Sequence, residues 1–334
     1  MKATNNPPTA RPRSSQRTLS RHRGRHPVLL AGCLLTAVLA HAAEGRLNGF
    51  DVANALIPVE AIRRGGPPRD GIPAIDRPRF QPASQPAPWM EDDDLLLSVT
   101  VGDETRGYPL RILVWHEIVN DTIAGRPIAV TYCPLCGTGM VFDRRAGGRE
   151  LSFGVSGLLY QSDVLMYDRQ TESLWSQLAM KSVAGPLAGT PLNWLPAEHV
   201  TWKAWRQEHP DGRVLTTDTG FTRNYRATPY RRYFESPDTM FPVPEHRTEL
   251  PKKAWVLGVL VEGRPQCYPL ALLEKKGRIE DRVGDVAIEV RFEPDTRRAR
   301  VTRLADGQPL PSVMAYWFAW QAFHPETGLW KETE

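Results

Sequence analysis

The 334-residue sequence contains only four cysteines and lacks the motifs of several large enzyme classes. It has no G-x-S-x-G elbow, which argues against the usual nucleophile of the α/β-hydrolases. It also has no phosphate-binding loop and no dinucleotide fingerprint, so no nucleotide site is expected. A second Cys-x-x-Cys pair is missing, which argues against an iron–sulfur cluster held by this chain alone. So few cysteines also exclude a small fold that depends on several disulfides.

The chain beyond residue 43 also lacks an excess of positive charge. Residues 1–43 carry seven basic and no acidic residues, an apolar run from Val28 to Leu39, and a small-residue site at Ala40-His41-Ala42. This order is typical of a secretory signal peptide, and the run is too short to span a membrane. Without those seven residues, 35 basic residues face 38 acidic ones, a net charge of −3. Nucleic-acid binding, which needs a basic surface, is therefore not expected.

The signal segment predicts an exported protein, either periplasmic or extracellular. Association with a membrane surface is compatible with this prediction, but a membrane span is not expected after the signal is removed. Leu30-Ala31-Gly32-Cys33 resembles a lipoprotein cleavage box, so lipid anchoring at Cys33 is an alternative. We favour it less, because the apolar stretch continues beyond Cys33 to Leu39.

The mature chain divides by composition. The segment from 58 to 88 holds eight prolines, which excludes a regular helix or a central strand there. Apolar residues within and directly after this segment, such as Ile72, Phe80 and Trp89, favour an extended arm that lies on the body of the protein. We assign a signal peptide to 1–43, the proline-rich arm to 44–94, a first lobe to 95–221, a connection to 222–254 and a second, divergent lobe to 255–334.

An internal repeat supports the two lobes. Tyr108-Pro109-Leu110 recurs 160 residues later as Tyr268-Pro269-Leu270. The Trp202–Trp205 segment recurs 115 residues later as Trp317–Trp320, so the first copy has 45 additional residues between Gly137 and His199. We predict an α+β, β-rich fold of two related lobes from an internal duplication, with a β-meander inserted in the first. Pro109 suits a first helical position and predicts a helix from Pro109 to about Asn120.

The differences between the copies direct attention to the first lobe. Cys133 corresponds to Glu293, Cys136 to Thr296 and His116 to Lys276. The second copy keeps packing residues but lacks the thiols and the imidazole, so the scaffold does not need them. Chemistry in the first lobe is one explanation. Gain or loss of a stabilising cysteine pair in one copy is the other.

Cys133-Pro134-Leu135-Cys136-Gly137 is the most informative motif. Two cysteines at this spacing either share a metal or cycle between dithiol and disulfide. A thioredoxin-type site would need a helix after the first cysteine, but Gly137-Thr138-Gly139 starts a helix poorly and Met140-Val141-Phe142 favours a strand. The expected strand–turn–strand resembles a metal-binding knuckle. A redox pair, a structural disulfide and two buried thiols remain alternatives.

Other polar residues are candidates for the same site. His116 is the candidate third ligand, because a neutral imidazole complements two thiolates on zinc or copper. The inserted meander contains Asp163 and Glu172, which we name as candidate general acid or base groups, with Asp163 also a candidate fourth ligand. For each of them a structural role is the alternative: a buried histidine bonded to backbone, or carboxylates serving turns.

Several segments together resemble one family. They are Gly65–Asp76, Trp115–Asp121, Thr131–Gly139, Ser162–Gln177 and His209–Leu215. From about residue 57 to the C-terminus, the chain resembles the prokaryotic family catalogued as the domain of unknown function numbered 3179. The resemblance implies an exported or membrane-associated protein. It implies no established activity, so no catalytic residue is carried over.

Three functions are compatible with the sequence. The leading hypothesis is an exported metal-binding protein, with a metalloenzyme as one form of it, in which Cys133, Cys136 and His116 hold zinc or copper. Its partner would be a metal ion or a small-molecule substrate. The second hypothesis is a thiol–disulfide redox protein in which Cys133 attacks and Cys136 resolves. The third is a non-catalytic binding or assembly module with a structural disulfide.

Overall fold

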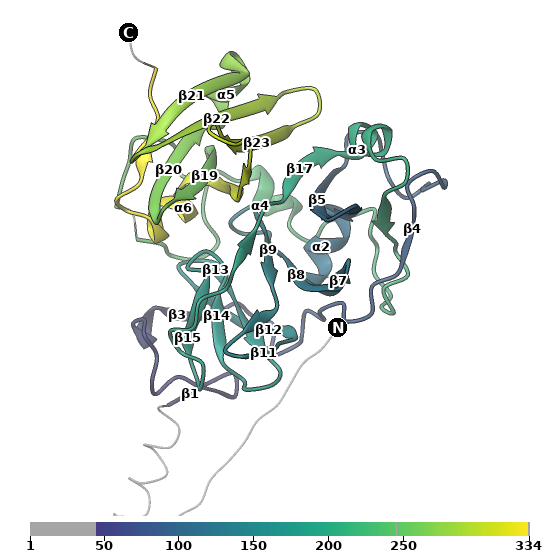
Figure 1. Cartoon of the computed structure of the whole chain (residues 1–334). Helices are drawn as coiled ribbons and strands as arrows, with labels where there is room; N and C mark the ends of the chain where they lie inside the picture. The colour runs from purple at the N-terminus through teal and green to yellow at the C-terminus, as the bar shows by residue number, and fades with distance from the viewer. Residues whose placement is uncertain (1–44, 245, 333–334) are drawn as a thin grey trace, which may run out of the picture. The chain divides into compact units, whose positions relative to one another are not determined.

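Residues 45–244 and 246–332 are described by a computed structural model, shown in Figure 1. The predicted signal peptide and Cys33 lie outside these residues. Within them the fold is β-rich, as predicted, and consists mainly of small antiparallel sheets with a few short helices. No helix in this part of the chain combines the length and the apolar character that crossing a membrane requires.

The proline-rich segment supplies short edge strands to the body. After the hairpin β1 (Arg46–Leu47) and β2 (Phe50–Asp51), the 3-10 turn η1 (Val59–Ala61) leads into β3 (Ile62–Arg64). β3 and β4 (Phe80–Pro82) each pair antiparallel with a strand far along the chain, β12 (Phe153–Tyr160) and β18 (Arg213–Leu215) respectively. These positions suit proline, because an edge strand can do without some backbone donors.

A first series of elements carries the Cys-x-x-Cys motif. It comprises β5 (Leu95–Val101), β6 (Glu104–Pro109), α2 (Leu110–His116), β7 (Ile118–Ile123), β8 (Arg126–Cys133) and β9 (Thr138–Asp143). It ends with β17 (Glu198–Thr201), α3 (Trp202–Glu208) and β18 (Arg213–Leu215). The helix expected to reach Asn120 was predicted too long. Glu117 takes a left-handed conformation that ends α2, and the β-branched Ile118-Val119 pair begins β7.

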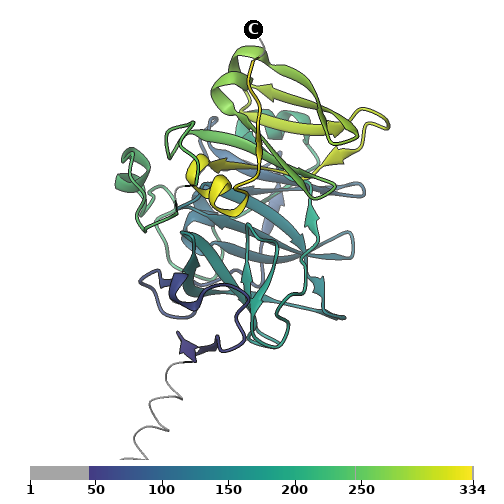
Figure 2. The same cartoon turned by 90° about the vertical axis from the view of Figure 1, so that its left-hand side faces the viewer.

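A second series follows the same order. It comprises β19 (Trp255–Val261), β20 (Arg264–Pro269), α5 (Leu270–Lys276), β21 (Arg278–Val283), β22 (Val286–Glu293), β23 (Arg298–Arg303), β25 (Ser312–Tyr316), α6 (Trp317–Phe323) and β26 (Gly328–Leu329). Its strands, green to yellow in Figures 1 and 2, form a group of their own. The registers agree as well: Leu96 pairs with Pro109, and Val256 pairs with Pro269. A common origin of the two series remains a prediction.

The segment between β9 and β17 contributes the sheet that faces the motif. It contains the hairpin β10 (Arg145–Ala146) and β11 (Arg149–Glu150), then β12 (Phe153–Tyr160), β13 (Asp163–Asp168), β14 (Leu174–Ser176), β15 (Lys181–Ala184) and β16 (Trp194–Leu195). β12 to β15 pair antiparallel, each with the next, and β3 completes their sheet beside β12. β24 (Pro309–Leu310) is a short edge strand beside β23.

The motif lies in a core shared by both series. Cys133 and Cys136 belong to one cluster of buried residues with Trp175, Trp317 and Trp320. The peptide nitrogen of Tyr316 donates to the carbonyl of Cys136 at 2.8 Å, so β25 braces the turn between β8 and β9. The connection between the series contributes α4 (Arg231–Glu235), whose Tyr233 joins the same core.

Gly137 closes the turn against the second series. Its φ of +69° is left-handed, and a Cβ there would overlap the ring of Trp255. Glycine is therefore required twice, by its backbone conformation and by the close approach of an indole ring.

Replacing Gly137 with alanine is expected to lower the free energy of unfolding by about 2–4 kcal/mol, because left-handed strain and overpacking add. Gly125→Ala is the matched control, since Gly125 has a φ of +75° and a Cβ added there would meet no atom within 4 Å. The control should lose only the backbone part, about 1–2 kcal/mol. Chemical denaturation measures both, and equal losses would contradict the packing role of Trp255.

His199 in β17 is buried and held neutral. Its exposed fraction is 8%, and Nε2 has no hydrogen-bond partner among the described residues. Burial, with the charge of Arg297 adding to it, lowers the pKa of His199 to about 4. The unfolded chain therefore binds a proton at His199 in the window from about pH 6.5 to pH 4, where the folded chain does not. Its contribution to stability is present above about pH 6.5 and is lost as the pH falls towards 4.

The variant His199→Gln is expected to lose less stability than the wild type between pH 7 and pH 4.5, by about 1–3 kcal/mol, because glutamine does not titrate. Urea denaturation of both proteins at a series of pH values measures this difference. Parallel pH profiles for the two proteins would contradict the assignment of a buried neutral imidazole.

Candidate metal site

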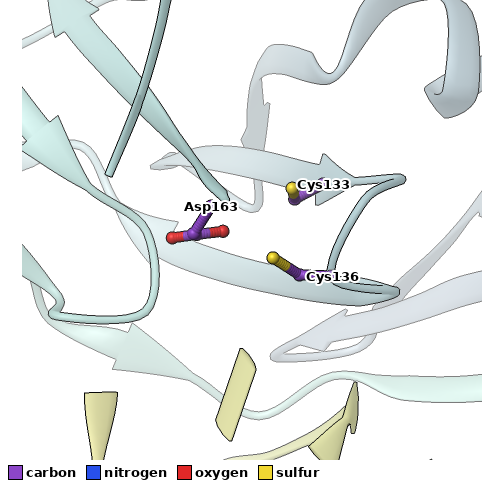
Figure 3. Close-up of side chains that lie close together, drawn as sticks. All are labelled: Cys133, Cys136 and Asp163. Carbon is purple, nitrogen blue, oxygen red and sulfur yellow. The ribbon is translucent and has the colours of Figure 1, made fainter. Parts of the chain in front are cut away.

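The two cysteines of the motif converge with a carboxylate. Cys133 is the last residue of β8, and Cys136 lies in the turn that leads to β9, as the predicted strand–turn–strand requires. Their Sγ atoms and a carboxylate oxygen of Asp163 all lie within 4.8 Å of one another (Figure 3). All three side chains are buried, with exposed fractions of 1% or less. The three cysteines of the described residues are free thiols.

Asp163 enters the cluster from the β12–β13 hairpin. Tyr160 pairs with Asp163, so Gln161 and Ser162 form a two-residue loop. Both loop residues are left-handed, with φ of 51° and 68°, although neither is the glycine or asparagine that such loops favour. The carbonyl of Ser162 faces both sulfur atoms, at 3.4 Å from Cys136 and 3.8 Å from Cys133. The loop therefore delivers a carboxylate and a carbonyl to the thiols.

Unpartnered polar atoms gather at this loop. Asp163 Oδ2 accepts the backbone N–H of Leu178 at 3.0 Å, but Asp163 Oδ1 has no hydrogen-bond partner among the described residues. Gln161 Oε1 and Ser162 Oγ are likewise buried without a partner there. Buried polar atoms are nearly always paired, because an unpaired one costs about 1–3 kcal/mol. Three such atoms therefore occur in consecutive residues of the loop whose Ser162 carbonyl faces both sulfur atoms.

The pKa values of all three groups in the cluster are raised, because the cluster is buried and no positively charged group in the described part of the chain offsets their charge. Burial raises the pKa of both Cys133 and Cys136, and the nearby charge of Asp163 raises both further. Burial also raises the pKa of Asp163 to about 7, although the backbone N–H groups of Leu178 and Val164 oppose it. A bound cation would reverse these effects, because it favours the thiolate and carboxylate forms.

His116 does not join the cluster. The ring is fully buried at the end of α2, where Nδ1 donates to the carbonyl of Pro73 at 2.7 Å. Nε2 then accepts from the hydroxyl of Tyr225 at 2.7 Å, so both ring nitrogens are occupied. The group of potential ligands contains Asp163 in the place predicted for His116. The structure thus gives His116 the structural role that the sequence left open.

Glu172 is also placed elsewhere. It lies in the turn between β13 and β14 with a φ of 59°, and its carboxylate is 2.8 Å from the guanidinium of Arg69. Its side chain is 55% exposed, so it shares none of the burial of the cysteine cluster. Cys267 in β20 is a separate buried thiol, and burial raises its pKa to about 12.

Glu117 is a residue that the sequence interpretation did not single out. Its exposed fraction is 6%, and its backbone carbonyl accepts the N–H of Tyr132, the neighbour of Cys133. Burial raises its pKa to about 8, and the charge of Asp163 adds to this effect. The internal repeat could have identified this residue, because at the offset of 160 residues Glu117 corresponds to a glycine, Gly277.

Aromatic residues of the connection cover the motif. The hydroxyl of Tyr233 donates to the carbonyl of Leu135 at 2.6 Å, and the hydroxyl of Tyr230 faces Glu117 Oε1 at 3.5 Å. The ammonium of Lys253 lies 3.8 Å from the centre of the Tyr233 ring and donates to the carbonyl of Ser236. This cover excludes bulk water from the thiols.

Comparisons with known proteins identify the family without naming an activity. A family model described as "Protein of unknown function (DUF3179)" matches residues 69–327, which is most of the chain. No curated protein and no solved structure matches the chain. The chain therefore belongs to the DUF3179 family, as its motifs predict.

Proposed function

We propose that this chain is an exported metal-binding protein whose centre consists of Cys133, Cys136 and Asp163. The observation that carries the proposal is the convergence of three potential ligand atoms, two Sγ and one carboxylate oxygen of Asp163, within 4.8 Å of one another. All three residues are buried, and Asp163 Oδ1 has no hydrogen-bond partner among the described residues. Two thiolates and a carboxylate bring three negative charges, which a divalent cation largely offsets. Export is inferred from the character of residues 1–43.

The ligand types favour zinc over copper. Thiolates select soft or borderline metals, and a carboxylate oxygen is a hard ligand. Zn²⁺ accepts both, whereas Cu(I) prefers sulfur ligands alone. The fourth position would admit water or a small-molecule substrate if the protein were a metalloenzyme, with Asp163 as its general acid or base.

The corresponding turn of the second series supports a specific role for the thiols. There Thr296 Oγ1 donates to Glu293 Oε2 at 2.9 Å, so the turn is closed by an internal hydrogen bond. If the two series arose by duplication, the same turn is stabilised in two different ways. Only the turn of the first series places sulfur atoms beside a buried carboxylate. The thiols are then not needed for the turn itself.

A thiol–disulfide function is the second candidate, favoured by the closeness of the two sulfur atoms. It requires a thiolate that a partner can reach. Burial raises the pKa of both thiols and Tyr233 lies over the turn, so attack on an external disulfide would be slow.

Metal loading is the direct test of the first candidate. The full chain, purified after expression with zinc, is expected to carry close to one zinc per molecule by native mass spectrometry with elemental analysis. Asp163→Asn keeps the shape of the side chain but removes its charge, and should weaken zinc binding by at least about tenfold. Cys133→Ser with Cys136→Ser should abolish it.

Glu172→Gln is the control for Asp163→Asn, because it neutralises an exposed carboxylate of the same segment that lies outside the cluster. It is expected to load zinc like the wild type. A wild-type chain that stays free of metal, or equal loading of the wild type and Asp163→Asn, would contradict the proposal.

The redox candidate makes its own prediction. If Cys133 and Cys136 form a catalytic pair, alkylation and mass spectrometry should find them oxidised in protein from the native compartment, and mild dithiols should reduce them. We expect both to be found as metal-protected thiols instead, which react with the alkylating reagent only after a chelator is added. A disulfide in the freshly isolated protein would favour the redox candidate.

A further inference from the structure

The strained position of Glu117 suggests a further part of the same centre. Glu117 ends α2 with a φ of 59°, a left-handed conformation that is strained for a residue with a Cβ. The equivalent helix α5 ends at Gly277 with a φ of 67°, where glycine adopts the conformation freely. Both residues have the same local hydrogen bond, from their N–H to the carbonyl four residues earlier. The first series therefore keeps a strained glutamate where the fold needs only a glycine.

The carboxylate of Glu117 is poorly hydrogen-bonded. Its side chain is buried, and its one hydrogen bond among the described residues comes from the Tyr230 hydroxyl at 3.5 Å. Bonds between a hydroxyl and a carboxylate are normally about 2.5–2.7 Å, so this contact is weak. A buried carboxylate with a weak partner and a strained backbone is doubly unfavourable for the fold alone. Such features mark functional sites rather than stable cores.

The position of Glu117 directs it to the cysteine cluster. Its carbonyl accepts the N–H of Tyr132 at 2.8 Å, which places it beside the residue that precedes Cys133. The charge of Glu117, when it is ionised, adds to the raised pKa of Cys133, and the charge of Asp163 adds to the raised pKa of Glu117. That cluster contains Asp163, whose Oδ1 has no hydrogen-bond partner among the described residues.

We propose that Glu117 is the fourth protein ligand of the metal centre, reached by rotation of its side chain away from Tyr230. This inference rests on the proposed function. It turns the centre into a closed set of two sulfur and two oxygen donors, as in structural zinc sites, instead of one with an open catalytic position. Two thiolates and two carboxylates around Zn²⁺ leave the same net charge as the common four-cysteine site.

The test compares three variants of the full chain. Zinc affinity is measured by competition with a chromophoric chelator, and the ligand set by the visible spectrum of the Co²⁺-loaded protein. Glu117→Gly and Glu117→Gln should each weaken zinc binding by at least about tenfold and change the Co²⁺ spectrum. Without metal, Glu117→Gly should raise the melting temperature by about 2–4 °C, because it relieves the strained backbone and removes a buried carboxylate.

Glu262→Gly is the matched control. Glu262 is an exposed glutamate in the β19–β20 turn with a φ of 50°, so its replacement relieves similar strain far along the chain from Cys133 and Cys136. It should leave zinc affinity and the Co²⁺ spectrum unchanged. Wild-type affinity and spectrum in both Glu117 variants would overturn the assignment of Glu117 alone. A wild-type chain that binds no zinc would overturn the proposed function together with it.

Discussion

Burial of two thiols and a carboxylate without a positive partner is the constraint on which the rest of the site depends. An anionic group in a protein interior is stable only when it is paired, protonated or bound to a metal. Here the pKa of each of the three groups is raised, and Asp163 Oδ1 has no partner among the described residues. A bound cation would favour the ionised forms of all three groups and would offer a partner to that oxygen.

The surrounding structure holds this arrangement in place from three directions. β13 supplies Asp163 through a strained two-residue loop, and β25 braces the turn through the Tyr316 N–H on the carbonyl of Cys136. Trp255 packs against Gly137 from the second series. Every one of these supports comes from a segment distant in sequence. The second series, which has no counterpart of Cys133 or Cys136, therefore contributes packing contacts to the turn that carries them.

Much of this could be predicted from the sequence, because it follows from local pattern. The β-branched run before Cys133 and the glycines after Cys136 predict a strand, a turn and a second strand, and β8 and β9 confirm them. The β-rich character follows from the same kind of evidence. Asp163 was identified as a candidate because it is a carboxylate in a segment that the second series does not contain.

The remaining features depend on contacts that no local pattern contains. The partners of His116 are Pro73 and Tyr225, 43 and 109 residues away, and they occupy both ring nitrogens. The end of α2 at Glu117 was missed because glutamate favours a helix, whereas here it takes a left-handed conformation directly before β7. Comparison with Gly277, which ends α5 with a φ of 67°, shows that glycine can adopt the backbone conformation of this position without strain.

X-ray absorption at the zinc edge, on protein isolated from its native compartment, tests the central claim most directly. The account predicts two sulfur atoms at about 2.3 Å from the metal and oxygen atoms at about 2.0–2.2 Å. A shell without sulfur, or a protein whose Cys133 and Cys136 are joined in a disulfide with no metal bound, would contradict it.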